Sequence, residues 1–579
     1  MVQIYKKMMK LLDKKQKRAM VGIVFMMLIG AILEALGISV IVPIVQIVMD
    51  EKALVEPGIA KTIYDILGLK NQKQFTLVIL GAMAAIFALK NIYLYIQQKV
   101  LCHFVYTNQF RTSQRMMRNY LHKDYEFFLN ADTAVVQRTI TSDVNNMYAL
   151  ILNSLQLVSE LIVSVIIAAV LIVSDWKMTL VISGMLGVTL LLINMAIKPV
   201  MRQAGKDNQD YYSRLFKLIS QTVMGIKEVK VTAREQNFVD DYIKCGKGYV
   251  DAVQKYTLLT SVPRLLIETV CISGTVVYMM VLIAMGTPLA DLITTLTVFA
   301  MAVVRLMPCA TRINTYMNNI SYFEPFLMGV SDNLQDEINH PDLKIEFAKE
   351  DQKKMPVKKA ITLDDITYKY PNSEKLIFDH ASMEVPIGKA VGIVGTTGAG
   401  KSTVVDILLG LLKMQGGTVR ADGVDIQTDY YGWLKNVGYI PQMIFMLDDT
   451  IRRNVAFGLP DEAIDEDRIW EVLKEAQLDE FIKTLPEGLD TSIGERGIRL
   501  SGGQRQRIGI ARSLYNDPDV LIMDEATSAL DNDTEAAIIE SINRLHGKKT
   551  LVIIAHRLQT IENCDMIYRV EDGKVLRER

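Results

Sequence analysis

The hydrophobic residues of the chain are concentrated in six long stretches, all within the first 330 residues. A membrane-spanning helix needs about 20 apolar residues to cross a hydrocarbon core roughly 30 Å thick. The stretches that meet this requirement lie at about 20–48, 75–98, 147–174, 178–198, 261–286 and 291–317. They predict an α-helical six-span transmembrane domain over 1–330, a polar linker at 331–358 and a soluble α/β domain over 359–579.

The positions of the basic residues predict the orientation of these spans. Seven Lys and Arg residues lie in the first segment, MVQIYKKMMKLLDKKQKR, and the long connections 99–146 and 199–260 are also rich in Lys and Arg. Such segments stay on the cytoplasmic side of a membrane. A signal peptide is disfavoured because the apolar run is too long and no small-residue cleavage site follows. We therefore expect a multi-pass protein with its N-terminus and soluble domain in the cytoplasm, whose helices continue beyond the membrane into the long inner connections.

Composition narrows the class of protein further. Hydrophobic residues make up 50% of the chain, and 64 basic residues against 65 acidic ones give a formal net charge of −1. This balance disfavours a protein held on nucleic acid by bulk charge. The cysteines are odd in number and contain no CxxC pair, which disfavours a disulfide scaffold and a zinc site. They are Cys102, Cys245, Cys271, Cys309 and Cys564.

The segment VGIVGTTGAGKSTVVDILLG, which begins at residue 391, reads as a short strand, a glycine-rich turn and a helix. It fits the P-loop pattern G-x-x-x-x-G-K-[ST], in which backbone N–H groups and a helix N-terminus surround phosphates. We expect Lys401 to reach the β- and γ-phosphates and the Ser402 hydroxyl to bind Mg²⁺. The predicted phosphate-binding residues are Gly395, Thr396, Thr397, Gly398, Ala399, Gly400, Lys401, Ser402 and Thr403.

A second apolar strand, 520–523, ends in two carboxylates about 120 residues further along the chain. Asp524 is placed to bind Mg²⁺ beside the P-loop. Glu525 points elsewhere and is expected to polarise the attacking water as a general base.

Between these motifs lies Leu500-Ser501-Gly502-Gly503-Gln504, and with it the region 360–579 resembles the nucleotide-binding domain of ABC transporters. The resemblance implies ATP hydrolysis with Mg²⁺ as cofactor. It also implies roles for four further residues. Tyr370 resembles the aromatic residue that stacks on adenine, Gln442 the Q-loop residue that touches Mg²⁺, Asp531 the D-loop residue, and His556 the switch histidine at the γ-phosphate.

The chain carries one P-loop and one LSGGQ segment, and in this family the two face each other only across a dimer. The resemblance therefore implies a homodimer with two composite sites, in which Ser501, Gly502, Gly503 and Gln504 contact the partner's nucleotide. Glu525 and His556 are both present, so both sites are expected to hydrolyse ATP.

Six spans followed by an ATPase domain in one chain resemble an ABC exporter half-transporter. In exporters the inner loops end in short coupling helices that dock on the ATPase. The segments 124–128 and 225–238 occupy the matching places, although ordinary amphipathic surface helices fit the same pattern.

Four basic residues lie within apolar surroundings, namely Lys90, Arg264, Arg305 and Arg312. A central Lys or Arg costs ~2.5–3.5 kcal/mol on insertion scales, so such residues usually face a cavity or a partner. Arg305 and Arg312 are two helical turns apart, roughly 10 Å along one helical face. We predict that the four line a cavity for an anionic substrate.

Two alternatives need no cavity. In the first, Arg264 forms an ion pair with Glu268 or Glu34. In the second, Lys90 and Arg312 extend their charged ends to the membrane interface.

The membrane sequence also resembles bacterial ABC flippases of lipid-linked oligosaccharides, through RLMPxxxR, the VPR before the fifth span and the short external segment 57–69. This resemblance implies transfer of a polyprenyl-pyrophosphate-linked oligosaccharide, used in protein glycosylation, to the outer leaflet of the bacterial inner membrane. The alternative within exporters is export of lipid A, drugs or peptides. A non-transport ATPase machine is disfavoured by the six spans, and a regulatory channel by the intact catalytic motifs.

Overall fold

The structure is a computed structural model of the 579-residue chain. It describes residues 2–39, 72–174, 176–286, 289–339, 347–349, 352–524, 540, 542–554 and 561–579. The chain divides into two compact units, the first formed by 1–122 and 131–345 and the second by 123–130 and 346–579. A short segment from the membrane half of the sequence therefore belongs to the unit that contains the ATPase motifs.

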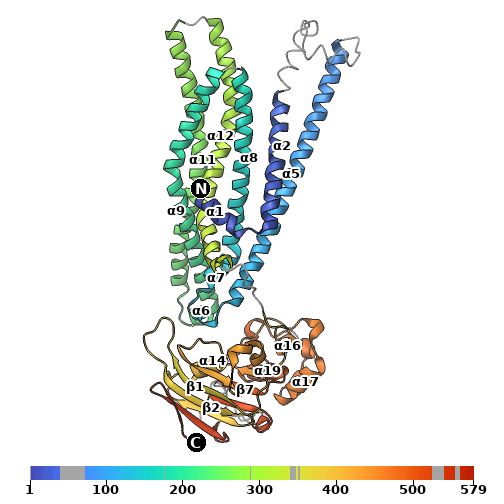
Figure 1. The fold of residues 1–579 in the computed structure, drawn as a ribbon, viewed down its shortest axis with the longest axis vertical. Helices are drawn as coiled ribbons and strands as arrows, with labels where there is room; N and C mark the ends of the chain where they lie inside the picture. The colour runs from blue at the N-terminus through green and yellow to red at the C-terminus, as the bar shows by residue number, and fades with distance from the viewer. Residues whose placement is uncertain are drawn as a thin grey trace. The chain divides into compact units, whose positions relative to one another are not determined.

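The first unit consists of helices, several of them very long (Figure 1). They are α1 (Val2–Leu11), α2 (Lys14–Ser39), α5 (Gln72–His122), α7 (Thr133–Arg138), a π-helical turn (Thr139–Asp143), α8 (Val144–Ser174), α9 (Trp176–Met224), α10 (Ile226–Val231), α11 (Glu235–Ala284), α12 (Leu289–Asn333) and α13 (Gln335–Asn339). Helix α5 has 51 residues, which is about 75 Å at 1.5 Å per residue. Such a helix extends well beyond a bilayer core, so the predicted continuation of the spans is confirmed.

The surface of the long helices suits a lipid environment. Among the described residues, five helical segments are long and apolar enough to cross a membrane. The sixth predicted stretch falls on α12, which continues through Pro308 without a break. Apolar side chains on α5 are exposed, such as Leu77 at 70% and Leu89 at 67%. The predicted external segment 57–69 lies outside the described residues.

The region 331–358 is only in part the polar linker that the sequence predicts. Helix α12 continues to Asn333 and α13 follows it directly, so the first third of this region is helical. Leu334, between the two helices, is fully buried in a core cluster of the first unit. The start of the predicted linker is therefore part of the first unit, although its composition is polar.

The second unit contains two β-sheets and several helices, as predicted for an α/β P-loop domain. An antiparallel sheet has the strand order β2-β1-β4-β5 and a six-stranded sheet the order β10-β9-β3-β8-β7-β6. Their bounds are β1 (Ala360–Tyr368), β2 (Phe378–Pro386), β3 (Ala390–Gly395), β4 (Gly416–Ala421), β5 (Val424–Asp425), β6 (Val437–Ile440), β7 (Val520–Asp524), β8 (Thr550–Ile554), β9 (Met566–Glu571) and β10 (Lys574–Arg577). In the larger sheet the strands pair in parallel except β10 with β9.

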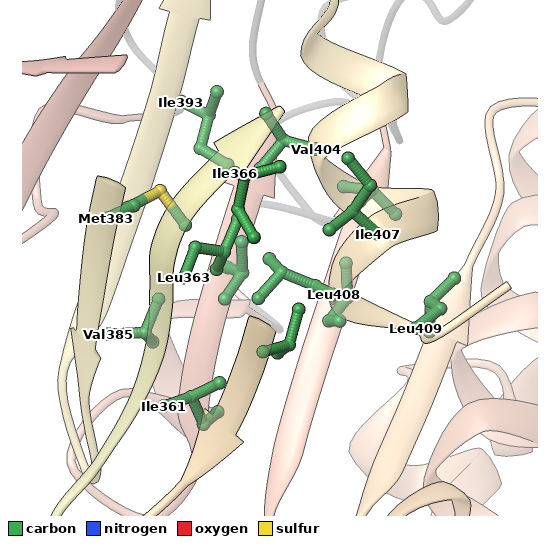
Figure 2. Close-up of a cluster of buried hydrophobic side chains, with 14 of the residues drawn as sticks. Ile361, Leu363, Ile366, Met383, Val385, Ile393, Val404, Ile407, Leu408 and Leu409 are labelled. Atoms are coloured by element: carbon green, nitrogen blue, oxygen red, sulfur yellow. The ribbon is translucent and has the colours of Figure 1, made fainter. Parts of the chain in front are cut away.

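The helices of this unit surround the sheets. They are α6 (Tyr125–Asn130), α14 (Lys401–Leu408), α15 (Tyr430–Leu434), α16 (Ile451–Val455), α17 (Glu466–Glu475), α18 (Asp479–Thr484) and α19 (Gly502–Tyr515). Figure 2 shows Val404 and Leu408 of α14 directed towards Ile366 and Leu363 of β1 within one buried cluster. Ile407 and Leu408 are at most 1% exposed, and burial of such a side chain is worth about 1.5–3 kcal/mol. This packing holds α14 against the sheets, and the P-loop leads into its first residue, Lys401.

Candidate active site

The P-loop occupies the turn between β3 and α14, and two of its glycines are required by its geometry. A Cβ atom on Gly395 would lie 2.6 Å from the carbonyl oxygen of Val570. Gly400 has φ 109°, and a Cβ atom there would lie 2.9 Å from the side chain of Ile377. Only glycine accepts the backbone angle at Gly400 without strain and the close approach at Gly395.

The polar residues that follow the loop are held at the N-terminal end of α14. Lys401 is 5% exposed, and its ammonium donates to the carbonyl oxygens of Gly395 at 3.0 Å and Thr396 at 3.1 Å. Ser402 is exposed, whereas Thr403 is buried with its Oγ1 3.0 Å from the hydroxyl of Tyr370. The lysine charge and the helix N-terminus therefore meet at the loop, which is the arrangement that binds phosphates.

Asp524 ends β7, a strand of the same parallel sheet, and it is 6% exposed. Asp406, on α14, was not identified from the sequence. Burial of Asp406 and the negative charge of Asp524 raise the pKa of the Asp406 carboxyl to about 6. Burial and a neighbouring carboxylate both disfavour the charged form of such a group. Asp406 could have been noticed in the sequence as the one acidic residue in the apolar run VVDILLG that follows the P-loop.

The donor atoms near the loop fit the Mg²⁺ that the ABC family implies. In the part of the chain that the structure describes, no group of three His, Cys, Asp or Glu side chains is placed to hold a metal. Mg²⁺ does not need one, because it takes one or two carboxylates together with waters and substrate phosphates. Three oxygen donors come after or at the ends of neighbouring strands. Ser402 lies at the start of α14 after β3, Gln442 follows β6, and Asp524 is the last residue of β7. A metal held by these residues would neutralise charge on the transferred phosphate.

The LSGGQ segment forms the N-terminus of α19, and its serine is the N-cap. Ser501 Oγ accepts from the backbone N–H of Gln504 at 3.2 Å, and Gln504 Oε1 accepts from the backbone N–H of Ser501 at 2.8 Å. This capping box uses the serine as an acceptor, so its hydroxyl proton is directed away from the helix. Ser501 and Gly502 are exposed and Gly503 is buried. The exposed hydroxyl can therefore donate to a phosphate, as the sequence analysis predicts.

Three predicted residues lie outside the described residues, namely Glu525, Asp531 and His556. Tyr370 and the P-loop residues are brought together by the hydrogen bond between the hydroxyls of Tyr370 and Thr403. Gln442 is exposed beyond the end of β6.

The first predicted coupling segment contains the helix α6, which contacts β1 and the segment after α14 in the second unit. Glu126 of α6 accepts from the hydroxyl of Tyr368 at 3.2 Å and from the backbone N–H of Lys413 at 3.1 Å. Asp124 lies 2.6 Å from the Lys413 ammonium. The prediction of a docked helix here is confirmed. The second segment contains α10, which belongs to the other unit.

Comparison with known proteins agrees with this geometry. Residues 378–528 match the ABC transporter family and residues 38–307 match the ABC transporter transmembrane region. The ATP-dependent lipid A-core flippase of Haemophilus influenzae is 30% identical over 475 residues, which cover 80% of this chain and 78% of that protein. The chain belongs to the ABC transporter family.

Two further similarities extend over most of this ABC transporter. The ATP-dependent lipid A-core flippase of Saccharophagus degradans is 30% identical over 410 residues, or 70% of this chain and 67% of that protein. A solved bacterial Atm1-family ABC exporter with ATP bound has the same fold, with a TM-score of 0.74 over 97% of this chain and 95% of that one, at 22% identity. The two flippases are named for lipid A-core, whereas the predicted resemblance was to oligosaccharide flippases. The ATPase domain is a nucleotide hydrolase coupled to transport.

One predicted substrate residue of the ABC transporter is engaged by an acidic partner that sequence reasoning missed. Arg312 Nη2 lies 2.9 Å from Glu160 Oε1, on α8. The Arg312 side chain is 46% exposed and that of Glu160 11% exposed. Arg312 was predicted to line a cavity or, in the alternative, to extend to the membrane interface, and the ion pair with Glu160 replaces that alternative.

The other three predicted cations are placed differently. Arg264 is exposed on α11, next to the buried Pro263. The ammonium of Lys90 lies 4.7 Å from the ring centroid of Phe87, one turn earlier on α5. Arg305 lies on α12, and its side chain is outside the described residues.

Proposed function

We propose that this ABC transporter is an ATP-driven flippase that moves an anionic glycolipid of the lipid A type from the cytoplasmic to the outer leaflet of the bacterial inner membrane. The observation that carries this proposal is the extent of the similarity to the Haemophilus influenzae flippase, which covers 80% of the chain. That length takes in the membrane half as well as the ATPase half. A likeness restricted to the ATPase half would support ATP hydrolysis but would carry no information on the cargo.

A polyprenyl-pyrophosphate-linked oligosaccharide is the second candidate cargo. It shares with the first a lipid tail, sugars and phosphate groups, and phosphates bind strongly to arginine in a low-dielectric site. The proposed cargo-binding residues are Lys90, Arg264, Arg305 and Arg312. Glu160 already accepts from Arg312, so a cargo phosphate would compete with this carboxylate. The oligosaccharide lipid is favoured only by the short motifs around Arg305, Arg312 and Arg264 and by the external segment 57–69.

The hydrolytic step that we infer uses residues of this chain in separate roles. Lys401 and the P-loop amides hold the phosphates, and Tyr370 stacks on the adenine. Glu525 takes the proton of the attacking water, while His556 contacts the γ-phosphate. Positioning and electrostatic stabilisation supply most of the rate enhancement in such reactions.

We also infer that the working form is a homodimer with two composite sites. One P-loop and one LSGGQ segment per chain support it. The apolar residues of α10 support it as well, because Ile226 is 48% exposed and Val231 is 79% exposed. A cytoplasmic helix with such exposed apolar residues requires a protein surface to cover it. In this arrangement Asp531 and Ser501 would face the partner's nucleotide. The Lys- and Arg-rich inner segments support a cytoplasmic ATPase domain.

The test is translocation in proteoliposomes that contain the purified protein. Three fluorescent probes are compared with and without ATP and Mg²⁺: lipid A, a polyprenyl-pyrophosphate oligosaccharide and a cationic dye. We expect ATP-dependent movement of lipid A, and none with Lys401→Ala. Faster movement of the oligosaccharide lipid would transfer the assignment to the second candidate. Movement of the dye alone would reject a lipid cargo.

A further inference from the structure

The ion pair of Arg312 and Glu160 belongs to a line of polar contacts between two helices of the membrane unit. Helices α8 and α12 pack along each other (Figure 1). Besides the ion pair at 2.9 Å, the side-chain amide of Asn319 donates to Asn153 Oδ1 at 2.8 Å. On each helix the two contacting positions are seven residues apart, which is about 10 Å along one helical face. The two contacts therefore hold one face of α8 against one face of α12.

The two members of the ion pair differ in their freedom to move. The Glu160 side chain is 11% exposed, whereas that of Arg312 is 46% exposed. Arg312 Nη2 also lies 3.8 Å from Cys309 Sγ, one turn earlier on α12. A nearly buried side chain moves only if its neighbours repack, whereas a long arginine side chain can change rotamer at its exposed end. We therefore expect the arginine to turn away from a fixed glutamate when another anion binds it.

A carboxylate in contact with Arg312 competes with every other anion for the same N–H donors. The phosphodiester of an ordinary anionic phospholipid carries a single negative charge, and such lipids are abundant in the cytoplasmic leaflet. A phosphate monoester carries about −1.5 to −2 at pH 7, and Coulomb attraction grows in proportion to charge. Glu160 is therefore displaced more readily by a multiply charged phosphate head than by a phospholipid.

We propose that Glu160 is a specificity-determining residue, which holds Arg312 in the absence of cargo so that only a lipid with a multiply charged phosphate head displaces it. This inference rests on the proposed flippase function and names the head group that the site selects. Both bis-phosphorylated lipid A and a polyprenyl pyrophosphate have such a head. The selectivity comes from a penalty against the wrong lipid and not from an additional contact with the right one.

A second ion pair of the same kind provides a matched control. Arg202 Nη2, on α9, lies 3.3 Å from Glu324 Oε1, on α12, with side chains that are 59% and 10% exposed. Both residues lie beyond the predicted spans 178–198 and 291–317. Glu324→Gln therefore removes a carboxylate of similar burial from a similar pair, away from the proposed cargo residues.

The experiment measures lipid-stimulated ATP hydrolysis by the full-length protein in nanodiscs of phosphatidylcholine. Lipid A with two phosphates and a polyprenyl-pyrophosphate oligosaccharide are titrated separately, and we expect at least one of them to stimulate the unmodified protein. In Glu160→Gln the half-maximal concentration of that lipid should fall about threefold to tenfold. Hydrogen bonds to charged groups are worth about tenfold or more in an equilibrium constant, and the exposure of Arg312 reduces this factor.

The selectivity is measured by repeating the titration in nanodiscs of equal parts phosphatidylcholine and phosphatidylglycerol. Phosphatidylglycerol should raise the half-maximal concentration in Glu160→Gln by a larger factor than in the unmodified protein, because the carboxylate no longer excludes it. Glu324→Gln should match the unmodified protein in both kinds of nanodisc. Glu160→Met has a similar length without the charge, and it carries the same expectation if Glu160→Gln does not fold.

A purely structural role of Glu160 predicts the opposite sign, a loss of stability together with an unchanged or higher half-maximal concentration. That result, an equal effect of Glu324→Gln, or equal sensitivity of Glu160→Gln and the unmodified protein to phosphatidylglycerol would overturn the proposal. If neither multiply charged lipid stimulates the unmodified protein, the proposed function fails and this inference fails with it. Stimulation of the unmodified protein that Glu160→Gln does not alter rejects the inference alone.

Discussion

The pair formed by Arg312 and Glu160 predicts that removal of the arginine destabilises the membrane unit before it affects transport. Two unit charges about 4 Å apart interact by ~4 kcal/mol at an effective dielectric constant of 20. The Arg312 side chain is 46% exposed, so screening reduces this by about half, to ~2 kcal/mol. Glu160 is only 11% exposed, and Arg312→Ala leaves its charge in place without that partner. We therefore expect Arg312→Ala to lower the unfolding free energy by about 2 kcal/mol.

The assay is thermal unfolding of the purified protein in one detergent, together with ATP hydrolysis. The double variant Arg312→Ala/Glu160→Gln removes the isolated charge and should recover most of the lost stability. Its translocation of lipid A then reports on the cargo role of Arg312 separately from the structural one. An Arg312→Ala protein as stable as the unmodified one would refute the electrostatic reasoning. A double variant no more stable than the single one would refute it as well.

Three further predictions concern the ATPase unit. Glu525→Gln should bind ATP but turn it over at less than about 1% of the normal rate, measured by phosphate release, because general base catalysis contributes about 10²–10⁴-fold; normal turnover would reject its role. In a mixed dimer with Lys401→Ala in one chain and Ser501→Ala in the other, one site stays intact and hydrolysis should be measurable. A mixed dimer with both substitutions in the same chain should be impaired at both sites. Equal activities of the two dimers would argue against composite sites. Hydrogen bonds from the Ala390 backbone N–H and from His546 lower the pKa of Asp565 to about 2. Asp565→Asn should therefore lower the free energy of unfolding by about 1 kcal/mol at pH 7, with solvent screening taken into account. Because the native pKa lies below the usual value of about 4, this difference should be complete above pH 4 and shrink as the pH falls towards 2 in thermal unfolding curves; a difference that stays constant with pH would contradict the assignment.

The nucleotide site could be predicted because its chemistry is local in the sequence. Gly395, Gly400 and Lys401 act within one turn, and the strand that ends at Asp524 is recognisable by its apolar run. Each of these features needs only the residue types at a fixed spacing, and the fold then places them. Ser501 and Gln504 were predicted only as residues that contact the partner's nucleotide, and the structure adds that they form a capping box.

The features that could not be predicted depend on residues far apart in the chain. Glu160 and Arg312 are separated by 152 positions and Glu126 and Tyr368 by 242. The periodicity of a segment does not specify which acidic side chain lies near which donor, because this depends on how distant elements pack in the fold. The fold of the membrane unit was predictable from the apolar stretches, but the partners of its charged residues were not. Asp406 shows the same limit at short range, because its significance depends on a strand that lies about 120 residues later.

The membership of 123–130 in the ATPase unit has a consequence for how such proteins can be recombined. An ATPase fragment cut from the chain at residue 359 would leave Tyr368, Asn372 and Lys413 without the carboxylates of Asp124 and Glu126 and the amide of Asn130. A chimaera that exchanges ATPase domains between two half-transporters would place these three residues against a foreign helix. The unit that can be exchanged is therefore discontinuous in sequence. Chimaeras that transfer α6 together with its own ATPase domain should keep the contacts between them, whereas chimaeras joined only at the linker should lose these contacts.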